Sequence, residues 1–149
     1  LLKASPNINF PVFTGHALAD SRLPKWLNDS VSARVRVLTA YPLTVENDHP
    51  GNKLHLQVLN SYAPSMTASR WTLYGHAVAE LMVEVLRRSG RGLTRQKAIF
   101  AAENINNWQG KFLPPISLDS RNHLVLTSFR VSQILPGRVN HLSEWIDGR

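Results

Sequence analysis

Three successive helix patterns with no strand between them are the feature that most constrains how this chain folds. The longest pattern repeats apolar residues at three- and four-residue steps over 71–85 and ends at Gly90 and Gly92. An amphipathic segment at 54–62 precedes it, and Thr94 can cap a third helix after it. Apolar helix faces pack on a sheet or on one another, so three of them need a substantial surface to cover.

The side chains expected to be buried follow the helical period in each segment. On the longest helix they are Trp71, Tyr74, Val78, Leu81, Met82 and Val85. We expect Trp71 in particular to belong to the core. On the other two helices they are Leu54, Val58, Leu59 and Tyr62, and then Ala98, Ile99, Ala102 and Ile105.

Few strands are available for these helices to cover. Phe10, Val12 and Phe13 form a short apolar run that predicts a buried strand ending at Thr14-Gly15. Residues 33–40 alternate apolar and polar side chains, which predicts a strand with one solvated face.

A short helix and a terminal hairpin complete the predicted elements. Asp20 can cap a helix that contains Leu23. Residues 125–131 and 139–142 predict two strands around a Pro136-Gly137 turn. The predicted order is strand, helix, strand, three helices and a hairpin, which does not close a sheet. This mismatch indicates that part of a larger protein is absent or that another chain supplies it.

The charge balance and the lack of cysteine exclude several classes of function. The 149 residues carry 17 Lys and Arg against 10 Asp and Glu, a net charge of +7. Part of the excess is a cluster after the longest helix pattern: Arg87, Arg88, Arg91, Arg95 and Lys97. Without interleaved aromatic residues, this cluster is typical of a solvated helix end and not of a nucleic-acid surface. Zero Cys excludes disulfides and thiolate metal sites, and no apolar run reaches the ~20 residues that cross a bilayer.

No motif in the chain predicts catalysis or a bound cofactor. The six histidines lack the i, i+4 spacing around a glutamate that a zinc-protease helix needs. The sequence has no Gly-rich phosphate loop and no G-x-S-x-G nucleophile elbow. We therefore expect no catalytic residue, no metal ligand and no cofactor, and we do not expect an enzyme.

The loop after the first strand is one candidate binding surface. It consists of Gly15, His16, Ala17 and Leu18. Ligands of open α/β sheets bind beyond the carboxyl ends of strands, and a glycine allows a tight turn with exposed N–H groups. The alternative is an ordinary connection between a strand and a helix.

The start of the longest helix is the second candidate. Ser69 and Arg70 lie there, and the free N–H groups of a helix N-terminus favour an anion. Arg70 can pair with a carboxylate through two hydrogen bonds. Tyr74, one turn later, either contacts the ligand or belongs to the core.

Several segments, in their order and wording, carry a resemblance to a known family. They are Phe10-Pro-Val-Phe-Thr-Gly15, Trp71-Thr-Leu-Tyr-Gly-His-Ala77, Ala79-Glu-Leu-Met-Val-Glu-Val-Leu86, Leu93-Thr-Arg-Gln-Lys-Ala-Ile99 and Leu113-Pro-Pro-Ile-Ser-Leu-Asp-Ser-Arg-Asn-His-Leu124. On these segments, nearly the whole chain resembles the C-terminal portion of type I periplasmic binding proteins of the branched-chain amino acid ABC transporter family.

The resemblance implies an α/β fold, periplasmic binding protein type I-like, with this chain a fragment covering parts of two Rossmann-like lobes. Residues 1–42 then finish the second lobe at a hinge crossing near Tyr41-Pro42. Residues 43–122 return to the first lobe as helices. Residues 123–149 form a strand hairpin that runs back toward the hinge and second lobe. The sheet beneath the three helices then lies in sequence that is absent here.

The resemblance also implies that the loop at 15–18 and the helix start at 69–70 contact a ligand between the lobes. The chain departs from the amino-acid-binding pattern at two positions. Ala17 stands where relatives can use an acidic side chain for the ammonium, and His76 stands where relatives often have Asp. Losing the carboxylate while Arg70 remains makes a carboxylate without an amine, such as an aromatic acid, an alternative to an amino acid.

The function expected from the resemblance is that of an extracytoplasmic solute-binding component of a bacterial ABC importer, located in the periplasm. Its partners are then a small-molecule ligand and a membrane permease, with no nucleic acid. The alternative is a ligand-sensing module of a regulator or receptor with the same fold. If these 149 residues form the entire molecule, a swapped or symmetric homodimer would cover the exposed helix faces.

Overall fold

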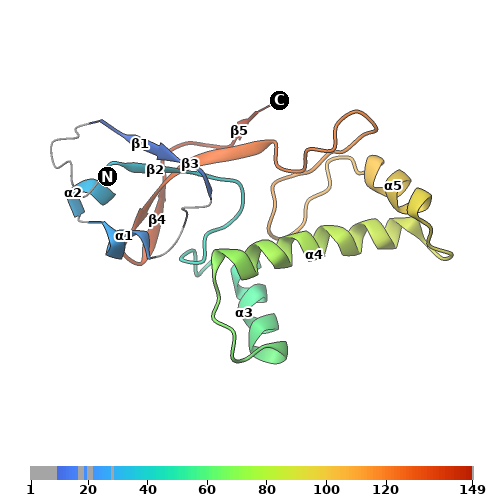
Figure 1. Ribbon diagram of the computed structural model, residues 1–149, viewed down its shortest axis with the longest axis horizontal. Helices are drawn as coiled ribbons and strands as arrows, with labels where there is room; N and C mark the ends of the chain where they lie inside the picture. The colour runs from blue at the N-terminus through green and yellow to red at the C-terminus, as the bar shows by residue number, and fades with distance from the viewer. Residues whose placement is uncertain (1–9, 17–18, 20–21, 28, 149) are drawn as a thin grey trace.

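The computed structural model describes residues 10–16, 19, 22–27 and 29–148. A five-stranded sheet lies at one end of the molecule and three helices lie at the other (Figure 1). The elements follow one another as a strand, short helices, a strand, three helices and then strands. The predicted order is confirmed, and the fold is mixed α/β. The predicted cap at Asp20 lies outside the described residues.

The first part of the sheet is a parallel pair joined by a helical connection. β1 (Val12–Thr14) pairs parallel to β2 (Val35–Thr39), with Val12 opposite Val35. The connection contains α1 (Leu23–Trp26) and α2 (Asp29–Ser32). Helices in such a connection cover one face of the sheet, as the packing of Leu23 with Val35 shows.

The C-terminal strands complete the sheet. β3 (Ser128–Leu135) runs antiparallel to β2 and to β4 (Arg138–His141). Gly137 has φ 70°, which confirms the predicted turn. β5 (Ile146–Asp147) pairs with the first residues of β3 and was not predicted, because two residues are too few to show alternation.

Burial in β1 and β2 follows the faces of the sheet. Val35, Val37 and Thr39 are buried in β2, as the alternation predicts. Phe10 and Phe13 are 63% and 61% exposed, so the prediction that the Phe-rich run is buried is wrong. Phe13 projects to the face opposite α1 and α2, and no described element covers it there.

The end of α4 (Arg70–Ser89) at Gly90 and the cap of α5 (Arg95–Glu103) at Thr94 are as predicted, whereas α3 (Pro50–Tyr62) begins at Pro50, before the predicted segment at 54–62. α3 begins after His49, whose side chain accepts from the Gly51 N–H. α4 begins with a capping box between Ser69 and Thr72 and ends at Gly90, which has φ 68°. α5 is capped by Thr94.

The predicted buried stripe of α4 is largely wrong. The buried side chains are Leu73, Ala77 and Val85, spaced at multiples of four. The exposed ones include Trp71 at 61%, Tyr74 at 44%, Val78 at 46% and Met82 at 55%. α4 is apolar on more than one face, and the described residues cover only one of them.

In α3 and α5, too, some of the side chains predicted to be buried are exposed. In α3 the buried side chains include His55 and Leu59, whereas Tyr62 is 85% exposed. In α5 the buried residue is Ala101, whereas Ile99 is 44% exposed. Ile105, just after α5, is buried as predicted.

The molecule has two hydrophobic cores. The helical core comprises Tyr41, Leu73, Ala77, Val85, Ala101, Ile105, Phe112, Leu113 and Ile116. The sheet core comprises Ala19, Leu23, Val35, Val37, Leu43 and Ile134. Tyr41 and Leu43, only two residues apart, belong to different cores, so this segment is where the two cores meet. In the described part of the chain, no helix has both the length and the apolar character needed to cross a membrane.

We predict that Leu73→Ala lowers the free energy of unfolding by about 2–5 kcal/mol, because Leu73 is fully buried in the helical core. Leu86→Ala is the matched control: Leu86 lies on the same helix but is 42% exposed, so its loss should be below ~1 kcal/mol. Urea unfolding followed by circular dichroism measures both. Equal losses would show that α4 is packed differently.

Candidate functional site

His16 lies just after β1, against the segment where the two cores meet. Its ring centroid is 3.6 Å from that of Tyr41. Both ring nitrogens are buried and have no hydrogen-bond partner among the described residues. Burial, and then the charge of Arg70, lower the pKa of His16 to about 4. The imidazole is therefore neutral at neutral pH and offers one donor and one acceptor.

Tyr41 connects His16 to the start of α4. The ring centroids of Tyr41 and Tyr74 are 5.9 Å apart. Burial, and then the nearby Tyr74, raise the pKa of Tyr41 to about 12, so its phenol remains protonated. The guanidinium of Arg70 lies over the Trp71 ring at 4.7 Å. We call His16, Tyr41, Arg70 and Tyr74 the junction cluster.

The structure brings together three of the seven residues predicted for a ligand site. His16, Arg70 and Tyr74 belong to the junction cluster. Gly15 is exposed beside His16, and a Cβ there would meet nothing within 4 Å. Ala17 and Leu18 lie outside the described residues. Whether any of the seven contacts a ligand stays a prediction.

Ser69 lies at the edge of this cluster as the N-cap of α4. Its Oγ accepts from the Thr72 N–H at 3.2 Å, so its own hydroxyl proton can still be donated. The first turn of any α-helix has backbone N–H groups without a carbonyl acceptor in the helix itself. Together with Arg70 they make the start of α4 electropositive.

Sequence reasoning missed Tyr41 as a site residue and placed it only at the hinge crossing that ends residues 1–42. Its signal was weak, because an aromatic residue before a proline also fits a simple strand terminus.

The junction cluster combines a cation, two phenols and a neutral imidazole around aromatic surface. This arrangement can bind a small anion with an apolar body.

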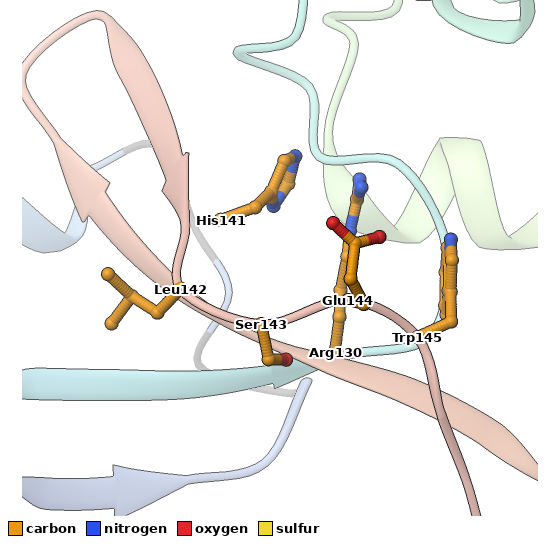
Figure 2. Close-up of a pocket in the computed structure, with 6 residues that line it drawn as sticks. All are labelled: Arg130, His141, Leu142, Ser143, Glu144 and Trp145. Carbon is orange, nitrogen blue, oxygen red and sulfur yellow. The ribbon is translucent and has the colours of Figure 1, made fainter.

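A second polar cluster ties the terminal hairpin to the segment after β2. Glu46 pairs with Arg130 at 3.4 Å and lies 3.6 Å from His141 Nε2. The Arg130 guanidinium lies 4.9 Å over the Trp145 ring. Figure 2 shows Arg130, Glu144 and Trp145 side by side in the lining of a cavity of about 430 Å³. The Glu46–Arg130 pair therefore fastens the hairpin to the junction of the cores.

Ser132, His141 and Glu46 follow one another like a serine–histidine–carboxylate triad. Ser132 Oγ lies 3.0 Å from His141 Nδ1 and 3.0 Å from Thr39 Oγ1. Ser132 has no exposed surface, so its hydroxyl cannot reach a substrate. The arrangement is a hydrogen-bond network that joins β2, β3 and β4; it is buried at Thr39 and Ser132 and reaches the surface at His141. Among the described residues, no three His, Asp or Glu side chains converge as metal ligands.

Comparison with known proteins gives matches in fold. No protein-family model matches the chain, and no curated protein matches its sequence. A branched-chain amino acid ABC transporter from Thermus thermophilus with bound valine matches over 98% of this chain and 42% of that chain, with TM-score 0.76 and 16% identity. A possible leucine/isoleucine/valine-binding protein from Rhodopirellula baltica SH 1 matches over 95% and 38%, with TM-score 0.74 and 16% identity.

A third structure, described as an ABC transporter permease from the Pseudomonas fluorescens group, covers 98% of this chain and 40% of that chain, with TM-score 0.76 and 20% identity. The chain has the fold of part of a type I periplasmic binding protein. The predicted fold class is thus confirmed. The chain spans about two fifths of the length of the solved structures it matches.

We predict that His16 makes the protein less stable in acid. The unfolded chain binds a proton at the ordinary pKa of 6.5, whereas folded His16 binds one only near pH 4. Acid therefore favours unfolding, and stability falls as pH drops from 6.5 toward 4, by at most about 1.4 kcal/mol per pH unit. The other histidines change the free energy of unfolding with pH equally in wild type and in His16→Phe. Urea unfolding of both proteins at pH 7 and pH 5 therefore isolates the contribution of His16. The same loss in both proteins would contradict the prediction.

Proposed function

We propose that this protein is the solute-binding component of an ABC importer and that it binds a small carboxylate at the junction cluster. The observation that carries the proposal is the position of that cluster. His16, Tyr41, Arg70 and Tyr74 converge from three chain segments at the place where the two hydrophobic cores meet. Clefts between two structural units are common ligand sites.

The two cores support a division of the chain into parts of two lobes. In this proposal residues 1–42 and 123–149 belong to one lobe and residues 43–122 belong to the other. The cores follow this division except near its boundaries, where Tyr41 and Val125 pack with the helical core and Leu43 and Val45 pack with the sheet core. Tyr41-Pro42 is a hinge crossing in this proposal. Two of the solved structures of similar fold are described as ABC transporter proteins, one of them with bound valine, and another is described as a possible leucine/isoleucine/valine-binding protein. This favours an importer component over a ligand-sensing module of a regulator.

The junction cluster favours an acid as the ligand. Arg70 and the start of α4 can hold a carboxylate, and His16 can donate to it or accept from another ligand group. Tyr41 and Tyr74 supply aromatic surface for the body of the ligand. The described cluster contains no carboxylate that could pair with an ammonium. An aromatic acid therefore fits the site better than an amino acid.

The remaining parts of the proposal concern the whole protein. A solute-binding component of this kind works in the periplasm and delivers its ligand to a membrane permease. The exposed apolar side chains of α4, among them Val78 and Met82, are suited to the sheet of a complete lobe. A second copy of this chain is the alternative cover for that face.

We predict that calorimetry detects benzoate binding at micromolar Kd and much weaker binding of leucine. Arg70→Met should weaken benzoate binding about tenfold or more, because it removes the charge-assisted pairing with the carboxylate. Arg70→Lys is the control, because it retains the charge and loses the two parallel hydrogen bonds of the guanidinium. Its benzoate affinity should lie between the affinities of wild type and of Arg70→Met. Tight leucine binding would overturn the aromatic-acid ligand. No binding of either acid by folded protein would contradict the proposed function.

We predict that His16→Phe separates binding from stability. Phenylalanine keeps a ring against Tyr41 and removes two buried nitrogens without hydrogen-bond partners among the described residues. At pH 7 the variant should be at least as stable as wild type, because a buried polar group without a partner costs about 1–3 kcal/mol. It should bind benzoate more weakly. Unchanged affinity would show that His16 does not contact the ligand.

A further inference from the structure

A buried histidine joins α3 to the first turn of α4. His55 is 3% exposed, and its Nε2 lies 2.9 Å from Thr72 Oγ1. Its other ring nitrogen, Nδ1, lies 3.1 Å from His76 Nδ1 in the second turn of α4. The His76 ring in turn packs on Phe112, with centroids 4.5 Å apart. His55 therefore contacts the start of α4 at two successive turns.

The hydrogen bonds around Thr72 allow the proton of His55 to be assigned to one ring nitrogen. Thr72 Oγ1 accepts from the Ser69 N–H at 2.9 Å and donates its only proton to the Ser69 carbonyl at 2.9 Å. With the Thr72 proton assigned to the Ser69 carbonyl, His55 Nε2 donates to Thr72 Oγ1 and His55 Nδ1 accepts from His76 Nδ1–H. Burial lowers the pKa of both histidines, in agreement with two neutral rings of opposite tautomer.

α3 is itself held against the segment where the two cores meet. The Asn52 amide donates to the carbonyls of Leu43 and Glu46 at 2.7 and 2.8 Å. At Gly51 a Cβ would lie 2.6 Å from the Lys111 carbonyl, so the backbones approach as closely as glycine allows. The first turn of α3 is thus held to residues 43–46, and His55, one turn later, is held to α4.

We propose that His55 is a positioning residue for the ligand site, which aligns Arg70 and Tyr74 with Tyr41 and His16 through Thr72. This inference rests on the proposed function. Thr72 lies between Arg70 and Tyr74 in the first turn of α4, so the direction of both side chains follows the position of Thr72. Asn52 of α3 also holds the carbonyls of Leu43 and Glu46, two and five residues after Tyr41, so the same helix contacts both α4 and the segment that follows Tyr41.

The test compares paired variants of the full chain. His55→Phe removes the donor to Thr72, whereas His55→Gln keeps an N–H that can reach the Thr72 hydroxyl. Benzoate and leucine are the calorimetric probes, and hydrogen exchange reports on the amides of residues 70–73. We expect His55→Phe to raise Kd about tenfold and to speed exchange in this turn, and His55→Gln to restore both to within about threefold of wild type.

A second pair makes the same comparison without changing the buried imidazole. Thr72→Val removes the hydroxyl and Thr72→Ser keeps it, so only the valine variant should behave like His55→Phe. This pair decides the question if His55→Phe does not fold. Equal affinity and equal first-turn exchange in wild type and in the folded variants would overturn the positioning role. If wild type binds neither acid, the proposed function fails, and the exchange of residues 70–73 still shows whether His55 orders the turn.

Discussion

The contact between the two hydrophobic cores at residues 40–46 is the constraint on which the rest of the structure depends. Tyr41 packs with the helices and Leu43 packs with the sheet, so neighbouring residues of one segment are buried in different cores. Glu46 forms an ion pair with Arg130 of β3 and so holds the terminal hairpin to this segment. α3, α4 and α5 share few other contacts with the strands, so this segment and the return of the chain from α5 to β3 connect the two ends of the molecule (Figure 1).

Element order and helix ends could be predicted from the sequence because their signals are local. Ser69, Thr94 and Gly90 act through hydrogen bonds and backbone angles within a few residues. Burial could not be predicted so well, because it depends on what lies opposite. Trp71 follows the helical period as closely as Leu73 does, yet Leu73 is fully buried and Trp71 is 61% exposed. Helical period alone cannot choose between two apolar faces.

The candidate site was predicted only in part for a related reason. His16, Arg70 and Tyr74 were found because a strand end and a helix start are recognisable features of sequence. Tyr41 and His55 do not lie at a strand end or helix start of this kind, and their proposed roles depend on contacts between distant segments. His55 meets Thr72 across 17 positions, and Tyr41 meets both His16 and Tyr74. Such contacts are properties of the folded chain and not of any local pattern.

The length of α4 has a mechanical consequence. Its 20 residues span about 30 Å, with Arg70 at the end beside the junction cluster and Arg87 and Arg88 at the far end. A helix of this length moves as a stiff rod, so a small rotation at its start becomes a larger displacement at its tip. A tilt of about 5° would carry Arg88 through roughly 2–3 Å. The orientation of α4 at the junction cluster therefore sets the position of the surface around Arg87 and Arg88.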